Sequence, residues 1–227
     1  SSPDARIEND QRIRVAFWGN ATTDPQPVTL NGVPFELIAN PVEPYVYGHT
    51  HSDITVYNVY TGASVATFPF AGDAREMTIS HDGAVLFVQD YASKAVVALD
   101  SATGTELRRY AYAPDDPYGL AYARPEAHPV LILANGNLFD VATGQRFTYA
   151  WPNTYFEDNG RIAVHPNGRS VYYSTKQATP ARVARYSLRY TALHSDFLRP
   201  PTWQASQTFS DVRRVCCRYQ MPSRRGL

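Results

Sequence analysis

The sequence predicts an all-β chain built from a repeated four-stranded antiparallel unit of about forty residues. Within residues 75–112, short apolar runs rich in Val, Leu and Tyr alternate with polar turns. Two of these turns, Asp82-Gly83 and Thr103-Gly104, contain a glycine, which accepts the positive φ of a tight reversal between strands. Residues 90–94 supply another polar turn. This order predicts a four-stranded meander, which is the blade of a β-propeller.

The same markers recur with one period. The Thr-Gly turn begins at Thr61, Thr103 and Thr143, at intervals of 42 and 40 residues. The second-strand runs share Val, Leu, Ile, Phe or Tyr, and they begin at Tyr45, Leu86, Leu131 and Val171. Runs this short and this rich in β-forming residues favour propeller blades over helical solenoids.

The repeat also predicts which positions turn and which are buried. We expect positive φ at the turn glycines, which are Gly83, Gly104, Gly144 and Gly168. We expect burial at the apolar strand positions, which are Ile79, Leu86, Val88, Val97, Leu131, Leu133, Ile162 and Val164.

The repeat sets the predicted domain boundaries. Whole blades are expected at residues 34–70, 75–114, 118–152 and 160–200. Residues 13–18 and 27–30 predict the last two strands of an earlier partial blade, and residues 202–212 predict the start of a later one. The predicted domains are therefore a flexible N-terminus at 1–11, propeller blades at 12–212 and an atypical basic tail at 213–227.

A family resemblance follows from these runs. Residues 80–88, Ser-His-Asp-Gly-Ala-Val-Leu-Phe-Val, and residues 95–104, ending in Asp-Ser-Ala-Thr-Gly, resemble the YVTN-type propeller repeat. Residues 165–173 resemble the first half of that repeat. The resemblance spans residues 34–200 and departs at Gln89-Asp90 and at residues 124–129, where the Asp-Gly turn is replaced. It implies a propeller similar to surface-layer proteins or quinoprotein amine dehydrogenase β-chains, located in the periplasm, at the cell surface or outside the cell.

Two closures of the ring stay open. The partial N-terminal and C-terminal blades would together complete a five-bladed ring, or the chain is an incomplete ring of the seven-bladed type usual in the resembled family. An incomplete ring leaves unpaired sheet edges, which favour self-association or assembly with another chain.

Composition excludes several classes of partner. The net charge is zero, so no overall charge attracts nucleic acid or a membrane surface, and no apolar run approaches a membrane-spanning length. Charge is uneven along the chain: residues 1–180 hold 19 acidic and 12 basic residues, whereas residues 181–227 hold 2 and 9. The only cysteines, Cys216 and Cys217, are adjacent, so they build no disulfide framework.

Candidate binding residues lie in the longer loops. In a propeller the loops joining the second to the third strand of each blade, and one blade to the next, share one face, here called the crossover face. Its predicted binding residues are Asp73, Asp115, Asp116, Tyr118, Tyr155, Glu157 and Asp158, with Asp90 in the same acidic set. They predict an acidic surface with aromatic neighbours for a protein or carbohydrate-like ligand. The alternative is that the carboxylates are solvated loop residues and the aromatic rings pack between blades.

A metal-like cluster lies in one hairpin. His49 and His51 are two apart, so on a strand they point the same way, and Asp53 is close enough to join them as a ligand. The alternative is that both are exposed turn histidines, because no other blade repeats them.

We therefore expect a non-catalytic propeller module, without a cofactor, that binds a partner through the crossover face outside the cytoplasm. The sequence contains no Gly-x-Ser-x-Gly nucleophile elbow and no phosphate-binding glycine loop. The alternative is a propeller-type enzyme, lactonase-like or quinoprotein dehydrogenase-like, with its site at the mouth of the central channel.

Overall fold

The computed structural model describes residues 5–7, 13–15, 30, 32–112, 119–147, 161–166, 168, 170–174, 183–187, 189–190 and 198–199. Among these residues every regular element is a strand, apart from the short 3-10 helix η1 (Pro125–Ala127). The predicted all-β class is therefore confirmed. The chain divides into two compact units, Ser1–Asp116 and Pro117–Leu227.

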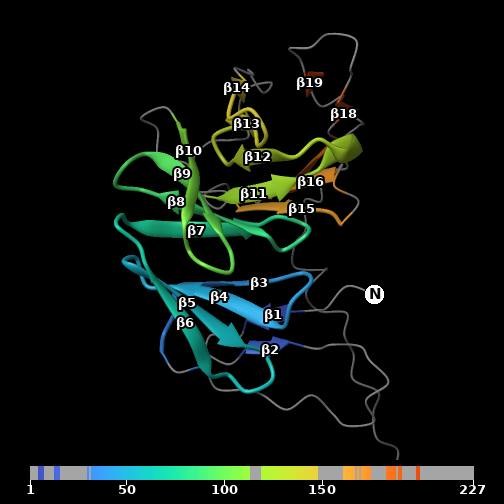
Figure 1. The fold of residues 1–227 in the computed structure, drawn as a ribbon. Coiled ribbons are helices and arrows are strands. Elements are labelled where there is room, and N and C mark those ends of the chain that lie inside the picture. Colours follow the sequence, from blue (N-terminus) through green and yellow to red (C-terminus); the bar gives the residue numbers. More distant parts are fainter. Residues whose placement is uncertain are drawn as a thin grey trace, which may run out of the picture. The chain divides into compact units, whose positions relative to one another are not determined.

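The first unit contains two four-stranded antiparallel sheets, each with its strands side by side in chain order (Figure 1). The first sheet consists of β3 (Glu36–Ala39), β4 (Tyr45–His49), β5 (Asp53–Asn58) and β6 (Ser64–Pro69). The second consists of β7 (Ala74–Ile79), β8 (Val85–Asp90), β9 (Ala95–Asp100) and β10 (Glu106–Ala111). Each sheet is the meander that the repeat predicts.

The Thr-Gly markers close an identical turn in three sheets. Oδ1 of Asp100 accepts hydrogen bonds from the backbone N–H and the hydroxyl of Thr103, at 2.9 and 3.0 Å. Asn58 and Asp140 hold Thr61 and Thr143 in the same way. The four predicted turn glycines have φ between 68° and 78°, so that prediction is confirmed. The repeated Thr-Gly residues therefore mark a turn held by hydrogen bonds from the backbone and the threonine hydroxyl to an Asp or Asn side chain, and these residue types form such turns readily.

The two sheets of the first unit share one apolar core. Leu86, Val88 and Val97 are at most 1% exposed and pack with Tyr47 and Ile54 from the first sheet. Burial at the first three of these positions is as predicted. Hydrophobic burial of this kind is the main stabilising contribution in a small domain.

Polar contacts also join these two sheets. The side-chain amide of Asn40 donates to the carbonyl oxygen of Gly83 at 3.2 Å, and the Ser101 hydroxyl donates to the same oxygen at 2.6 Å. The Tyr47 hydroxyl donates to the carbonyl oxygen of Ser101 at 3.2 Å. A Cβ at Gly83 would collide with the Asn40 side chain, so this position needs glycine for close approach as well as for its φ.

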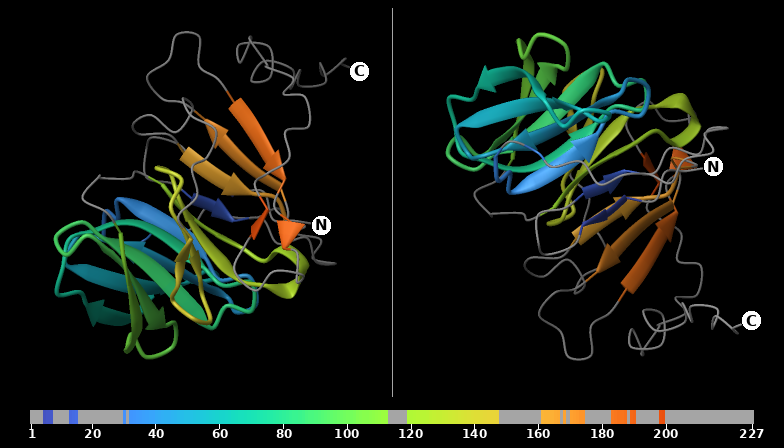
Figure 2. Two further views of the ribbon diagram at one scale, coloured as in Figure 1. Left: turned by 90° about the horizontal axis from the view of Figure 1, so that it is seen from above. Right: turned by 90° about the horizontal axis from the view of Figure 1, so that it is seen from below.

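The second unit contains one four-stranded and one three-stranded antiparallel sheet, seen from two further directions in Figure 2. The first consists of β11 (Leu120–Ala123), β12 (Val130–Leu133), β13 (Leu138–Asp140) and β14 (Arg146–Phe147). The second consists of β15 (Arg161–Val164), β16 (Ser170–Ser174) and β17 (Val183–Ser187), and a separate pair is formed by β18 (Arg189–Tyr190) and β19 (Leu198–Arg199).

Burial in the second unit follows the predicted pattern at its centre. Leu131 and Leu133 are fully buried, whereas Ile162 and Val164 are half-buried against the core. Ile79 of the first unit is likewise half-buried. The fully buried residues lie on β8, β9 and β12, each of which has a neighbouring strand on both sides. The half-buried residues lie on β7 and β15, which are edge strands of their sheets.

One local feature differs from the sequence expectation, and another takes a form that the sequence left open. Residues 13–15 form a strand as predicted, β2 (Ile13–Val15), but it pairs with β1 (Ala5–Ile7) inside the segment expected to be flexible. In the third blade, η1 takes the place of an Asp-Gly turn, and Ala127 has a φ of 70° there. The predicted partial-blade strand at residues 202–212 and the basic tail lie outside the described residues, as does the predicted strand at residues 27–30 apart from Leu30, which is not in a strand.

None of the elements in the described part of the chain is a helix long and apolar enough to cross a membrane.

Candidate functional site

Three loops of the first unit meet at one end of its two sheets. They are residues 50–52 between β4 and β5, residues 70–73 between β6 and β7, and residues 91–94 between β8 and β9. The backbone N–H of Phe70 donates to the carbonyl of Ser52 at 2.7 Å, and that of Tyr91 donates to the carbonyl of Asp73 at 2.9 Å. The loop that connects the sheets therefore touches both hairpins, as expected for the crossover face.

A continuous series of side-chain contacts runs across these loops. We call it the crossover strip; its members are Phe35, His51, Asp73, Arg75, Tyr91 and Lys94. The ring centroids of Phe35 and His51 are 4.2 Å apart, and Nδ1 of His51 is 2.8 Å from Oδ1 of Asp73.

The strip continues from Asp73 into the second sheet. Oδ2 of Asp73 accepts hydrogen bonds from Nε and Nη2 of Arg75, at 3.0 and 2.8 Å. The Arg75 guanidinium carbon lies 5.1 Å from the centroid of the Tyr91 ring, and the Lys94 ammonium lies 3.8 Å from the same centroid. Both cations are therefore attracted to a single aromatic ring.

Much of the strip faces solvent. Phe35 is 67% exposed, and the side chains of Arg75 and His51 are 41% and 38% exposed. An exposed phenylalanine next to charged groups is the pattern of a contact surface more than of a core.

Two strip residues have an unusual backbone conformation. His51 has a φ of 74° and Lys94 a φ of 54°, in the left-handed region that non-glycine residues seldom occupy. Such a conformation costs on the order of 1 kcal/mol and is common at functional loops. Both residues lie at the tips of second-to-third-strand hairpins, so the strain belongs to the crossover face.

The predicted metal ligands do not converge as a set of three, although the ring centroids of His49 and His51 lie 6.1 Å apart. Strand β4 ends at His49, and His51 lies in the turn, so the two-residue period of a strand does not apply to it. His51 contacts Asp73 instead of Asp53, whose Oδ2 accepts the Ser52 hydroxyl at 3.0 Å. Among the residues that the structure describes, no group of three His, Cys, Asp or Glu side chains is arranged to hold a metal ion.

His49 is enclosed behind the strip. It is 1% exposed, and within the described residues neither ring nitrogen has a hydrogen-bond partner. Nε2 lies 3.9 Å from Oε2 of Glu36, whose carboxylate accepts the backbone N–H of Met77 at 2.6 Å and so connects β3 to β7. Burial, followed by repulsion from His51, lowers the pKa of His49 to about 4.

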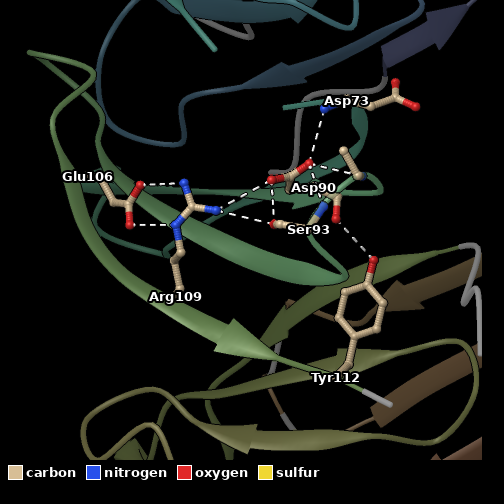
Figure 3. A network of polar contacts seen from close by, with 7 residues as sticks. Asp73, Asp90, Ser93, Glu106, Arg109 and Tyr112 are labelled. Carbon is tan, nitrogen blue, oxygen red and sulfur yellow. Dashed lines mark hydrogen bonds and ion pairs between the residues drawn. The ribbon is translucent and has the colours of Figure 1, made fainter. Parts of the chain in front are cut away.

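Asp90 is a structural residue and not part of an exposed acidic surface, so its inclusion in the predicted acidic set was wrong. It is 2% exposed, and its Oδ1 accepts backbone N–H groups from Asp73 and Ala92 at 3.0 and 3.1 Å. Its Oδ2 accepts the Ser93 hydroxyl at 2.5 Å and faces Arg109 at 3.4 Å (Figure 3). A short polar loop after a strand can use a carboxylate to satisfy its own backbone donors, which explains the burial.

The surroundings of Asp90 set its charge state. Burial alone would raise the pKa of its carboxyl, but hydrogen bonds from the Ser93 hydroxyl and from backbone N–H groups outweigh burial, so the pKa is lowered. The Arg109 guanidinium also donates twice to Glu106, at 2.7 Å each, and the Tyr112 hydroxyl donates to the Asp90 carbonyl oxygen at 3.3 Å (Figure 3).

Most of the predicted binding residues stay untested. Asp115, Asp116, Tyr118, Tyr155, Glu157 and Asp158 lie outside the described residues. Asp73 does lie on the crossover face, but it is bonded to Arg75 and His51. The sequence interpretation overlooked Phe35, Arg75 and Tyr91; the available signal was the placement of Arg75 and Tyr91 immediately beside predicted loops.

Comparison of the sequence with known families and proteins does not assign the chain to a family. No protein-family model matches the chain, and no curated protein matches its sequence.

Comparison with solved structures identifies the fold class. The chain is similar to hydrazine synthase from Kuenenia stuttgartiensis, with a TM-score of 0.55 at 14% identity over 76% of this chain and 49% of that one. It is similar to the WD40 repeats of RRP9, with a TM-score of 0.51 at 15% identity over 66% of this chain and 46% of that one. It is similar to the dihydro-heme d1 dehydrogenase NirN, with a TM-score of 0.52 at 18% identity over 82% of this chain and 43% of that one.

These similar structures are β-propellers, so the fold is of the β-propeller class. The chain spans less than half the length of each of the three. The specific likeness to the YVTN repeat stays a prediction.

Proposed function

We propose that the chain is a β-propeller interaction module that binds a protein partner through the crossover face of its first unit. The observation that carries the proposal is the crossover strip, in which His51 and Asp73 connect an exposed phenylalanine to two cations that lie over one tyrosine ring. Loops on a rigid sheet scaffold are where binding residues are usually placed.

The charge of the strip differs from the sequence expectation. Asp73 is the one carboxylate in it, and Arg75 and Lys94 are the cations. Aromatic and arginine side chains are enriched at the centres of protein–protein interfaces, whereas lysine and aspartate are depleted. Phe35, Tyr91 and Arg75 are therefore the residues that we expect to contribute most to affinity.

The structural comparisons are compatible with a binding role, but they do not distinguish a binding role from an enzymatic one. Similar propellers include WD40 repeats and a dehydrogenase, and one fold hosts many functions. The location outside the cytoplasm is part of the proposal and rests on the YVTN resemblance alone.

The test is a binding screen with variants at the two ends of the sheets. Purified protein is screened against peptide and oligosaccharide arrays, and hits are measured by calorimetry. Tyr91→Ser at the strip should weaken binding of a true ligand by about tenfold or more. Tyr60→Ser is the matched control, because Tyr60 is a 70% exposed tyrosine in the β5–β6 turn at the opposite end of its sheet. Equal losses in both variants, or a loss only in the control, would refute the assignment of the face.

A further inference from the structure

We infer that the crossover strip presents a hydrogen-bond acceptor to its partner, Nε2 of His51, and that the partner group is a tryptophan side chain that donates to it while packing on Phe35. The inference rests on the proposed function and adds the chemistry of the group that the strip recognises. The contacts of one imidazole ring and the exposure of its aromatic neighbour support it.

The contacts of Nδ1 fix the protonation of the His51 ring. Nδ1 lies 3.0 Å from the carbonyl oxygen of Ala74 and 2.8 Å from Oδ1 of Asp73. A carbonyl oxygen and a carboxylate accept hydrogen bonds but cannot donate them, so Nδ1 meets both favourably only when it carries a proton. In a neutral imidazole the other nitrogen then has the free lone pair. Nε2 is therefore the hydrogen-bond acceptor of this ring.

This acceptor is open to a partner. The His51 side chain is 38% exposed, and within the described part of the chain both of its polar contacts are made by Nδ1. The buried side-chain nitrogens that lack a hydrogen bond in that part both belong to His49, so Nε2 of His51 reaches solvent. Because the ring is already held through Nδ1, a partner that binds Nε2 need not immobilise it, which lowers the entropic cost of binding.

An exposed aromatic ring lies next to the acceptor. Phe35 is 67% exposed, and its ring centroid lies 4.2 Å from that of His51. The backbone N–H of Phe35 donates to the carbonyl oxygen of His49 at 2.9 Å, which ties this residue to the end of β4. A second aromatic ring gains contact area and favourable stacked or edge contacts at such a position. A group that satisfies both features combines an aromatic ring with a donor.

Tryptophan has this combination without a competing acceptor. Its indole N–H only donates, whereas a tyrosine hydroxyl both donates and accepts, and a phenylalanine ring does neither. Tryptophan is enriched among the residues that contribute most to interface affinity. Its ring also interacts more strongly with cations than other aromatic rings do, and Arg75 is bound to the same carboxylate as His51.

The test uses two uncharged peptides, acetyl-Gly-Trp-Gly-amide and the same peptide with benzothienylalanine in place of tryptophan. Benzothienylalanine has the shape of tryptophan with a sulfur atom where the N–H group lies, so the two peptides differ by one donor. NMR titrations of the full chain, labelled with nitrogen-15 at its six histidines, give the dissociation constant of each peptide. We expect the tryptophan peptide to bind roughly three- to tenfold more tightly, because only it makes the hydrogen bond.

The same spectra report the tautomer of His51. Protonated and unprotonated imidazole nitrogens have clearly different chemical shifts, and the His51 signals are assigned by their absence from His51→Asn. We expect the proton of neutral His51 on Nδ1, and we expect the Nε2 signal to move with the tryptophan peptide more than with its analogue.

Asp73 acts on the partner through His51 and is a positioning residue. Asp73→Ala removes one of the two acceptors at Nδ1, so the share of the tautomer with its proton on Nε2 should rise and the advantage of the tryptophan peptide should shrink. The matched control is Asp53→Ala, because Asp53 accepts the Ser52 hydroxyl instead. It should leave the tautomer of His51 as in the parent.

Variants at two histidines assign the preference. His51→Asn, whose asparagine tolerates the φ of 74° at this position, should reduce the advantage of the tryptophan peptide to less than about twofold. The benzothienylalanine peptide should keep its affinity within about twofold, which shows that the surface around Phe35 is intact. His81→Asn, at an exposed histidine in the turn between β7 and β8, is the matched control and should keep the full advantage.

Several results would overturn the inference. They are equal affinities of the two peptides for the parent chain, an undiminished advantage in His51→Asn, a neutral His51 with its proton on Nε2, or no shift at His51 with either peptide. The proposed binding face is judged separately. If both peptides bind equally and Phe35→Ser weakens both, the acceptor is refuted while the face survives. If ligands from the array screen respond to Tyr60→Ser and not to Tyr91→Ser, the face itself is refuted.

Discussion

At the scale of single residues, the structure separates carboxylates and histidines that look alike in the sequence. Asp73 and Asp90 both lie in polar loops, but Asp73 is part of the exposed strip and Asp90 holds its loop together from inside. His49 and His51 are two positions apart, yet one is buried without hydrogen bonds in the described structure and the other contacts a carboxylate. Long-range neighbours decide these roles, and a single sequence does not display them.

The buried His49 makes stability depend on pH. Its pKa is about 4 in the folded chain and 6.5 in an ordinary environment, so the unfolded chain binds the extra proton first as pH falls. The contribution of neutral His49 to stability is complete above pH 6.5 and is lost as the pH falls towards 4. We expect a loss on the order of 2 kcal/mol in the free energy of unfolding across this window.

Urea unfolding at a series of pH values measures this loss. His49→Leu should flatten the dependence between pH 6.5 and 4, and His81→Gln, at an exposed turn histidine, should leave it as in the parent. A parent-like pH dependence in His49→Leu would show that other groups cause the acid sensitivity.

Asp90 provides the second prediction at this scale. Asp90→Ala leaves the N–H groups of Asp73 and Ala92 and the Ser93 hydroxyl without their acceptor. Because unsatisfied buried donors are costly, we expect the free energy of unfolding to fall by about 2–3 kcal/mol. Asp53→Ala, at a less buried carboxylate bonded to Ser52, should cost under about 1 kcal/mol. Similar denaturation midpoints for the two variants would contradict the structural role of Asp90.

At the scale of elements, the residues that recur in the sequence are those that form the turns between strands. Asp100, Thr103 and Gly104 form one hydrogen-bonded turn, and the sequence predicted its position because the residues that make it are local. The replacement of the third blade's Asp-Gly turn by η1 was also visible in the sequence as a departure at residues 124–129. The pairing of β1 with β2 was not predicted, because β1 is only three residues long and lies within a mostly polar segment.

Gly83 tests the contact between the first two sheets. Its φ of 73° and the proximity of Asn40 leave no room for a side chain, so Gly83→Ala should lower the free energy of unfolding by about 1–3 kcal/mol. His81→Ala, in the same turn but exposed, is expected to change it by less than about 0.5 kcal/mol. Thermal or urea denaturation measures the free energy of unfolding of both variants. An unchanged free energy of unfolding in Gly83→Ala would contradict the tight turn and its close contact with Asn40.

At the scale of the whole molecule, the sequence predicted the class of fold well and the site poorly. The spacing of Thr61, Thr103 and Thr143 and the buried positions Leu86 and Leu131 identified propeller blades, because periodic patterning is a local property. The crossover strip joins residues from position 35 to position 94 in two sheets. Their proximity exists only after the sheets have packed, so no spacing in the sequence could reveal it.

Hydrogen exchange in the presence of ligand tests whether the strip end of the first unit is the binding face. Exchange is measured by mass spectrometry with and without a saturating concentration of a ligand found in the array screen. We expect slower exchange at residues 49–53, 70–75 and 90–94, where the crossover loops lie, and no change at the opposite turns, residues 58–63 and 100–105. Protection at the opposite turns with none at the crossover loops would contradict the assignment of the binding face.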